Sequence, residues 1–285
     1  MRVRFWGVRG SIPVPGPETA GYGGNTSCIE VVASSGHPLV LDCGTGARPL
    51  GWDLLRRKVS RVDILFSHFH MDHVFGFPFF GPIYSPGCMT HINIPAYTES
   101  EARDKLGRYL NGIYHPVRIR DIADRIQFNC LRLNQPFEIG PFRIAGVRLN
   151  HPGGAVGYRV EADGKSVVYL SDTAPLAHPN EGVIDGHSPP MAEARVIRSM
   201  KEADVVVMDT MFSSEEYLQK MTWGHSYPEY AFALAKEAGV KHLVLFHHAP
   251  DASDTALDAL AKHWTGRDGP RVTVAREGET LDLEG

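Results

Sequence analysis

The most constraining feature of this 285-residue sequence is a cluster of metal-binding residue types, Ser67-His68-Phe69-His70-Met71-Asp72-His73. The cluster follows the apolar residues 62–66, so we expect it to begin where a buried strand ends. Because alternate side chains of an extended segment point the same way, His68 and His70 can hold one ion together. Asp72 and His73 lie further round the turn and suit a second ion. An exposed histidine-rich turn is the alternative, but the cluster follows a hydrophobic strand and not low-complexity sequence.

Composition and charge limit the possible partners. With 43% hydrophobic and 22% charged residues, the chain is typical of a globular protein. The formal net charge of −4 provides no basic footprint for gripping long nucleic acid, so we expect neither DNA nor long RNA as a partner. Small anionic substrates stay possible, because a bound dication supplies local positive charge.

The chain start and the cysteines indicate a cytoplasmic protein with no membrane partner. The first residues read as a strand and not as a signal peptide, and there is no apolar span of about twenty residues. Four widely spaced cysteines without a C-x-x-C pair predict neither a disulfide framework nor a thiolate metal site. Cys28 and Cys43, beside strands, are expected to be buried free thiols.

The residue patterns predict two sheets packed face to face with helices outside, in one domain over residues 1–285. Ser226 and Glu229 predict a capping box for a helix that Gly239 ends. Five successive strand patterns in the middle of the chain predict a meandering sheet. The expected strands are 3–6, 27–33, 39–42, 62–66, 90–95, 128–133, 137–139, 142–149, 156–161, 166–170, 204–208 and 242–246, and the expected helices are 47–58, 99–109, 192–202, 226–238 and 255–264.

Two segments keep an open role. Residues 110–117 are aromatic and contain a histidine, so they either cover the metals as a substrate-contacting loop or pack as an ordinary surface loop. Residues 175–190 are irregular and contain His178 and His187, but they lack the basic character of an RNA clamp.

The pattern His68-x-His70-x-Asp72-His73 resembles the HxHxDH signature of the metallo-β-lactamase-fold hydrolases. Within that superfamily the chain is most similar to the ribonuclease Z and small cyclic-phosphodiesterase branch. The resemblance implies an α+β fold, the four-layer αββα sandwich of the metallo-β-lactamase fold, and a possible homodimer. Further motifs that carry it are Phe5-Trp6-Gly7-Val8-Arg9-Gly10-Ser11, Gly23-Gly24-Asn25-Thr26-Ser27, Leu41-Asp42-Cys43-Gly44-Thr45-Gly46, Asn150-His151-Pro152, Ser171-Asp172-Thr173, Gly224-His225-Ser226 and Phe246-His247-His248.

The same resemblance implies two divalent metal ions, with zinc first and manganese or iron as alternatives. Nitrogen and oxygen ligands without thiolate accept several metals, so the sequence does not name the native one. The ligands that the resemblance assigns are His68, His70 and His151 for the first ion, Asp72, His73 and His247 for the second, and Asp172 as the bridge.

Three of these residues also have a rationale of their own, because His151, Asp172 and His247 each follow a strand pattern and should lie where strand ends meet loops. His247 and His248 are adjacent and point to opposite sides, so only one should face the metals. His247 matches the position of the family's last histidine, and His248 is the alternative. Asp42 is expected to organise its turn, with a ligand role as the alternative.

Water held between two dications loses a proton near neutral pH, and the resulting bridging hydroxide can attack phosphorus or a carbonyl carbon. An alkoxide leaving group also needs a proton, and His225, which matches the histidine of the ribonuclease Z HST motif, is predicted to supply it. Asp209 resembles the acidic partner that raises the pKa of this histidine. Asp72 is also predicted to be a catalytic residue, together with His225 and Asp209. The alternative for His225 is a solvent-exposed histidine at a helix start.

The predicted function is hydrolysis of small phosphodiesters, with cyclic nucleotides or related cyclic phosphates first. In ribonuclease Z a tRNA-gripping arm is expected between the motifs of His151 and Asp172, but only 21 positions separate them here and two strands fill that space. The alternatives are a ribonuclease Z-like RNA hydrolase, a carboxylic-ester or lactone hydrolase, and a non-catalytic nucleotide-binding or cofactor-biosynthesis accessory protein of the same fold.

Overall fold

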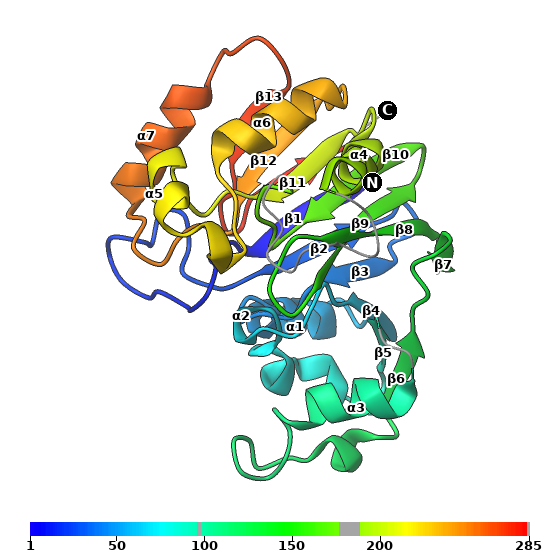
Figure 1. Cartoon of the computed structure of the whole chain (residues 1–285). Helices are drawn as coiled ribbons and strands as arrows, with labels where there is room; N and C mark the ends of the chain where they lie inside the picture. The colour runs from blue at the N-terminus through cyan, green and yellow to red at the C-terminus, as the bar shows by residue number, and fades with distance from the viewer. Residues whose placement is uncertain (96–97, 177–188, 284–285) are drawn as a thin grey trace.

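The computed structural model describes residues 1–95, 98–176 and 189–283. Two seven-stranded sheets pack face to face with helices on their outer faces (Figure 1), which confirms the expected αββα sandwich. The strand orders are β14-β1-β2-β3-β4-β5-β6 and β13-β12-β11-β10-β9-β8-β7. The strands are β1 (Arg2–Gly7), β2 (Cys28–Val32), β3 (Pro38–Leu41), β4 (Arg61–Leu65), β5 (Met89–Ile94), β6 (Ile126–Cys130), β7 (Phe137–Ile139), β8 (Phe142–Leu149), β9 (Ala155–Ala162), β10 (Lys165–Leu170), β11 (Val205–Asp209), β12 (His242–Phe246), β13 (Arg271–Val274) and β14 (Thr280–Asp282).

Three apolar layers hold this sandwich together. The layer between the sheets joins side chains such as Phe5 and Phe246, whose ring centroids lie 6.3 Å apart. Helices α1 and α3 cover the outer face of the first sheet, and α4, α6 and α7 cover that of the second. The helices are α1 (Ala47–Arg56), α2 (Met71–Val74), α3 (Glu99–Gly107), α4 (Pro189–Met200), α5 (Ser214–Gln219), α6 (Pro228–Glu237) and α7 (Asp254–Trp264), with short 3-10 turns at Phe77–Phe79, Gly81–Tyr84, Ile119–Ile122 and Met221–Trp223.

Strand direction brings distant residues to one end of the sandwich. In the first sheet β3 and β4 are parallel, and in the second β10, β11 and β12 are parallel. Strand β8 runs in the same direction as β10, because both are antiparallel to β9. The two sheets are joined at this end by hydrogen bonds from Val156 N to Ser67 O (3.1 Å) and from the Tyr158 hydroxyl to Phe66 O (2.8 Å). Residues that follow these strands therefore share one edge.

The expected five-stranded meander is wrong in its first member. Strand β6 pairs in parallel with β5 and so belongs to the first sheet. The reason is packing, because Phe128 of β6 lies in the outer apolar layer with Ala102 and Leu106 of α3. The chain crosses to the second sheet only after β6. The sequence patterns do not predict strands β13 and β14 or helices α2 and α5.

The predicted capping box at Ser226 is also wrong. Helix α6 begins at Pro228, with Tyr227 as the N-cap residue and no side-chain cap. Proline fixes the first helical position, so the helix starts later than the Ser226 pattern requires. The Ser226 carbonyl instead accepts a hydrogen bond from Phe212 N at 3.0 Å, and its buried hydroxyl has no partner within the described structure.

The cysteine prediction is confirmed. All four cysteines are free, and Cys28 and Cys43 are buried. Within the described ranges, no helix has the length and apolar character needed to cross a membrane.

Candidate metal centre

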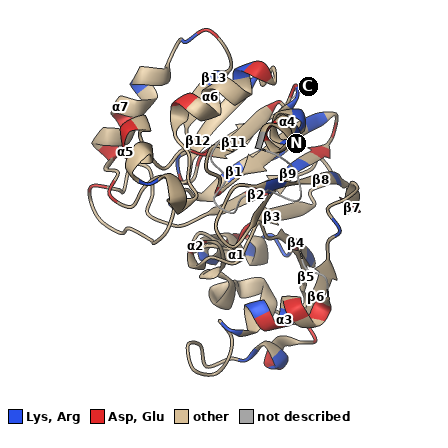
Figure 2. Cartoon of the chain, in the orientation of Figure 1, with Lys and Arg blue, Asp and Glu red and all other residues tan. Residues whose placement is uncertain are grey.

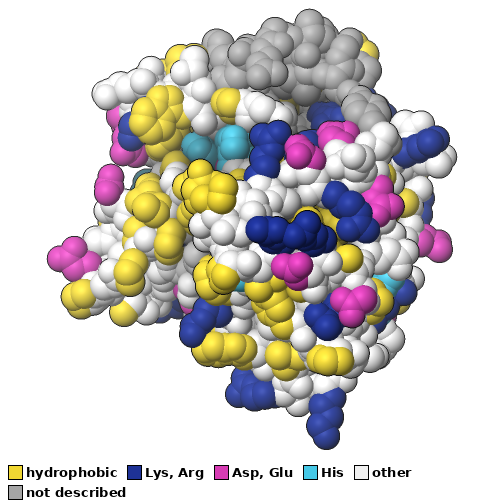
Figure 3. Space-filling view, turned by 90° about the horizontal axis from the view of Figure 1, so that it is seen from below, with side chains coloured by type: hydrophobic (Ala, Val, Ile, Leu, Met, Phe, Trp, Pro, Cys, Tyr) yellow, Lys and Arg dark blue, Asp and Glu magenta, His cyan; other side chains and the backbone are white. Residues whose placement is uncertain are grey.

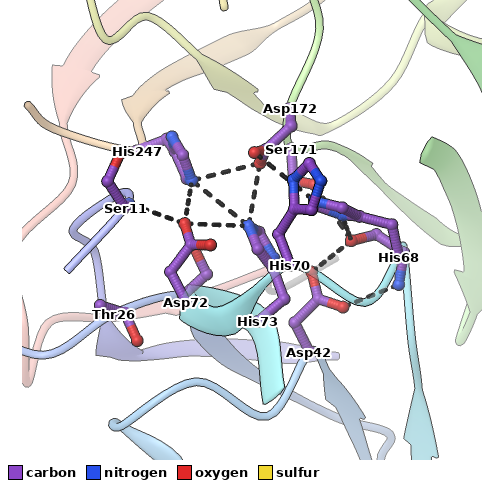
Figure 4. Close-up of polar contacts among 12 residues, drawn as sticks. Ser11, Thr26, Asp42, His68, His70, Asp72, His73, Ser171, Asp172 and His247 are labelled. Carbon is purple, nitrogen blue, oxygen red and sulfur yellow. Dashed lines mark hydrogen bonds and ion pairs between the residues drawn. The ribbon is translucent and has the colours of Figure 1, made fainter. Parts of the chain in front are cut away.

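Seven histidine and aspartate side chains converge at the edge where the strands end. Figure 4 labels all of them except His151. They come from the segment after β4, including α2, and from the residues that follow β8, β10 and β12. In each of two groups, the possible ligand atoms lie within 4.8 Å of one another. The groups are His68, His70, His151 and Asp172, and Asp72, His73, Asp172 and His247.

Asp172 is the residue that both groups share. Its Oδ1 lies 3.0 Å from His73 Nε2 and 3.1 Å from His247 Nε2. Its Oδ2 faces the other group, at 3.7 Å from His68 Nε2 and 3.6 Å from His151 Nε2. One carboxylate oxygen is therefore directed at each group.

Unpartnered atoms in the cluster fit divalent metal ions. His68 Nε2 and Asp172 Oδ1 are buried without a hydrogen-bond partner in the described structure. Ring nitrogens also face each other, with His151 Nε2 at 2.9 Å from His70 Nδ1 and His247 Nε2 at 3.3 Å from His73 Nε2. Buried polar atoms are normally paired, and converging imidazole lone pairs and carboxylates are best satisfied by a cation. Nitrogen and oxygen donors of this kind suit divalent metals.

The charge states of His68 and Asp172 agree with this fit. Burial and the neighbouring His73 hold the pKa of His68 well below its usual range, so its imidazole is neutral. Burial alone would raise the pKa of Asp172, but His247 and His73 hold it well below the usual range. Ionised carboxylates and neutral imidazoles are the forms that coordinate metals. Burial would lower the pKa of His73, but the carboxylates of Asp172 and Asp72 raise it, so without a metal ion this ring is protonated. A bound cation would take the place of that proton.

Asp42 lies outside both groups and forms a hydrogen bond with one of their members, His73. Its Oδ2 accepts hydrogen bonds from His73 Nδ1 (2.7 Å), Ser67 Oγ (2.6 Å) and the Tyr169 hydroxyl (2.8 Å), and its Oδ1 accepts one from Ser67 N (2.7 Å). Donation from Nδ1 fixes the tautomer of His73 and leaves Nε2 free to face the cluster. Asp42 was expected to organise its turn, with a ligand role as the alternative, and its bonds to His73 and Tyr169 were not expected. A carboxylate placed directly after β3 was the available signal.

The His151 ring is oriented by a backbone contact that sequence reasoning also missed. Its Nδ1 lies 2.8 Å from the carbonyl of Gly224. Gly224 has a φ of +87°, and a Cβ at this position would lie 2.4 Å from His151 Nδ1. Only glycine combines this backbone conformation with so close an approach. On the other side of the cluster, Ser11 N donates to Asp72 Oδ2 at 2.7 Å.

His225 and Asp209 form a pair next to the shared carboxylate. His225 Nδ1 lies 2.9 Å from Asp209 Oδ2 and 3.9 Å from Asp172 Oδ2. Backbone N–H groups of Thr173 and Met211 hold the Asp209 carboxylate in place. Burial would lower the pKa of His225, but Asp209, together with Asp172 and Asp72, outweighs burial and raises this pKa to about 9. The alternative of a solvent-exposed histidine is wrong, since His225 is only 8% exposed.

Of the two adjacent histidines, only His247 reaches the cluster. His247 has a left-handed φ of +63°, and its Nε2 lies 3.1 Å from Asp72 Oδ2. His248 is buried elsewhere, with its Nε2 at 2.8 Å from the Ala275 carbonyl. Burial lowers the pKa of His248 to about 3, so it is a neutral core residue.

The tip of the segment 110–117 projects into solvent. Ile113 and Tyr114 at its tip are 84% and 83% exposed. Tyr114 and His115 line a cavity of about 340 Å³ together with Phe75 and Phe79, which follow the metal-cluster helix α2. The segment 175–190 lies largely outside the described residues.

Figure 3 shows histidine atoms reaching the surface, with hydrophobic side chains on one side and Lys or Arg on the other.

Residues 37–248 match the family described as "Beta-lactamase superfamily domain", and the chain therefore belongs to that superfamily. The chain is similar to the ribonuclease Z of Synechococcus sp. (strain WH7803), with 29% identity and coverage of 92% of this chain and 90% of the relative. Among solved structures, the metallo-beta-lactamase fold protein YhfI from Bacillus subtilis is similar at a TM-score of 0.68, 21% identity and 98% coverage of both chains. A diphosphatase from the PhnP family has a TM-score of 0.66 and 16% identity, and covers 99% of this chain and 98% of its own.

These two solved structures are similar in fold. Superfamily membership, the ribonuclease Z relative and the buried histidine and aspartate cluster together identify a metal-dependent hydrolase.

Proposed function

We propose that this chain is a dinuclear metal-dependent phosphodiesterase for small substrates, with cyclic nucleotides or related cyclic phosphates preferred. The observation that carries the proposal is the His225–Asp209 pair, which holds the His225 ring beside the shared carboxylate, with its Nδ1 3.9 Å from Asp172 Oδ2. An alkoxide leaving from a phosphodiester needs a proton. A carboxylic-ester or lactone hydrolase with the same cluster needs this donor less.

The proposed metal ligands are the seven residues of the two groups, with Asp172 as the bridge and zinc as the first choice of ion. A pair of divalent cations supplies water activated as a nucleophile at neutral pH and stabilises negative charge on the phosphoryl oxygens. His68 and His151 would hold one ion and His73 and His247 the other.

Protonation of the leaving oxygen is assigned to a side chain of the protein. His225 donates its Nδ1–H to Asp209, so the other ring nitrogen is left to protonate the leaving oxygen. Asp209 orients the ring and favours its protonated form, while the N–H groups of Thr173 and Met211 fix Asp209. His225 is the proposed general acid, and Asp209 positions it.

Substrate size is argued from the path of the chain between the two motifs. After His151 the chain forms a short turn, then β9 and β10, which are joined by Asp163 and Gly164, and then reaches Asp172. This stretch leaves no length for the RNA-gripping arm that the resemblance predicts in ribonuclease Z. Helix α3 also carries both acidic and basic side chains (Figure 2), and such a mixed charge is unsuited to binding an RNA backbone.

A ribonuclease Z-like RNA hydrolase is the second candidate. It is favoured by the relative named ribonuclease Z, which aligns with 92% of this chain. Both candidates use the same cluster and differ in the size of the substrate.

The two candidates are separated by a substrate panel. Purified protein loaded with zinc or manganese is assayed on cyclic nucleotides, bis(p-nitrophenyl) phosphate and precursor tRNA. We expect turnover of cyclic nucleotides and of the nitrophenyl diester. Cleavage of precursor tRNA alone would overturn the proposal in favour of the second candidate. His263→Ala, which removes a histidine of α7 outside the cluster, should behave as the wild type.

A further inference from the structure

An arginine occupies a core-facing position of β8 next to the candidate metal centre. Side chains of a strand alternate between faces, so Arg148 shares its face with Phe142 and Ile144, both buried between the two sheets. Arg148 is only partly exposed, and its guanidinium makes no hydrogen bond or ion pair with any other residue of the described chain. Arginine in partly buried positions is normally paired, so this side chain is suited to an external anion.

Arg148 lines a cavity of about 220 Å³ that opens on the metal cluster. His68 and His70 form one wall of this cavity, and His70 is the solvent-exposed member of its metal group. The backbone of Gly153 lies against His70, where an added Cβ would be 3.8 Å from His70 Nε2. A group bound here would touch the cluster on one side and the guanidinium on the other.

A second cation borders the same cavity. Lys105 of α3 lies over the ring of Phe69, with its Nζ 5.2 Å from the ring centroid. It also forms an ion pair with Glu101 at 2.7 Å, so its charge is partly offset. Two cations from separate elements therefore face one small cavity in a chain whose net charge is −4.

We propose that this cavity binds a second phosphoryl group of the substrate, with Arg148 as its main ligand and Lys105 as a weaker one. The planar guanidinium fork matches phosphate oxygens, and such charge-assisted bonds are about twice as strong as neutral ones. The inference rests on the proposed function and narrows it: the preferred substrate is a small phosphodiester that carries an additional phosphate near the scissile one.

The test is a binding comparison on metal-loaded protein that needs no turnover. Calorimetry measures the affinity for thymidine bisphosphate, with a phosphate on each sugar hydroxyl, and for thymidine monophosphate. We expect the wild type to prefer the bisphosphate by roughly ten- to hundredfold. Arg148→Met should abolish this preference, and Arg148→Lys should retain part of it. Arg143→Met, which removes an exposed arginine of the same strand outside the cavity, should keep it in full.

Several results would overturn the inference. The wild type could bind both ligands equally, or Arg148→Met could keep the preference. Should Arg148→Met fail to fold, Lys105→Met on the helix surface should still reduce the preference, and an undiminished preference there would count against the cavity. Wild-type turnover of bis(p-nitrophenyl) phosphate, which has no second phosphate, tests the proposed function separately. Turnover of bis(p-nitrophenyl) phosphate without a preference for the bisphosphate would contradict only the phosphate site at Arg148. A preference for the bisphosphate without turnover would contradict only the proposed function.

Discussion

Replacing Asp42 with asparagine should loosen the candidate metal centre without touching any of the seven proposed ligands. Asp42 is fully buried and accepts four hydrogen bonds, one on Oδ1 and three on Oδ2. Asparagine keeps the shape but loses the charge, and its amide nitrogen must face at least one of these donors. With the nitrogen in the place of Oδ1, the N–H of Ser67 loses its acceptor. In the other orientation, His73, Tyr169 and the Ser67 hydroxyl lose theirs.

The size of the effect follows from the less damaging orientation. One buried donor is left unsatisfied, which costs about 1–3 kcal/mol, and the remaining bonds no longer end on a charged acceptor. We therefore expect Asp42→Asn to lower the free energy of unfolding of the metal-free protein by about 2–4 kcal/mol. Because His73 loses a charged anchor, zinc affinity should also fall by roughly ten- to hundredfold.

The assay combines urea unfolding of the metal-free protein with a competitive zinc titration. Asp63→Asn is the matched control. Asp63 lies on β4, is also buried, and accepts hydrogen bonds from His37 and from Arg61 of its own strand, away from the cluster. The control should lose stability and keep wild-type zinc affinity. An Asp42→Asn protein that binds zinc as tightly as the control would refute the reasoning.

Three further predictions concern the proton donor and the ring orientation. His225→Ala should slow cyclic-nucleotide hydrolysis by about 10²–10⁴-fold, but bis(p-nitrophenyl) phosphate much less, since nitrophenolate leaves without a proton; equal losses in steady-state turnover would contradict a general acid. Asp209 raises the pKa of His225 to about 9, and the donor works only while protonated, so Asp209→Asn should move the alkaline limb of the kcat–pH profile to lower pH. An unmoved limb would argue against the pair. Gly224→Ala should lower the metal content measured by elemental analysis, because the added Cβ would lie 2.4 Å from His151 Nδ1. Gly164→Ala is the control: Gly164 has a φ of +69° and open space around it, so this variant should retain its metal. Equal metal contents in the two variants would mean that the clash is absorbed elsewhere.

Local sequence patterns were sufficient for most of the sandwich. The apolar runs before His68, Asp172 and His247 predicted strands, and the polar residues that follow them do lie at strand ends. Residues at the ends of parallel strands necessarily share a sheet edge, which is why their convergence could be expected. The helix and strand limits differ by a few residues.

Contacts between distant segments could not be predicted from local sequence patterns. Periodicity predicts a strand at 128–133 but does not say which sheet it joins, and packing of Phe128 against α3 decides that. The bond from Tyr169 to Asp42 spans 127 positions, and no local pattern encodes it. Arg148 interrupts an apolar alternation on β8, but the cavity beside it becomes visible only when α3 and the metal cluster are brought together.

The central claim is that these side chains hold two metal ions on either side of Asp172. Crystals grown with zinc, with diffraction recorded on both sides of the zinc absorption edge, test it directly through the anomalous signal. The account predicts two anomalous peaks that share Asp172, one among the imidazoles of His68, His70 and His151, and one among Asp72, His73 and His247. Zinc bound elsewhere on the chain, with no peak beside Asp172, would contradict it.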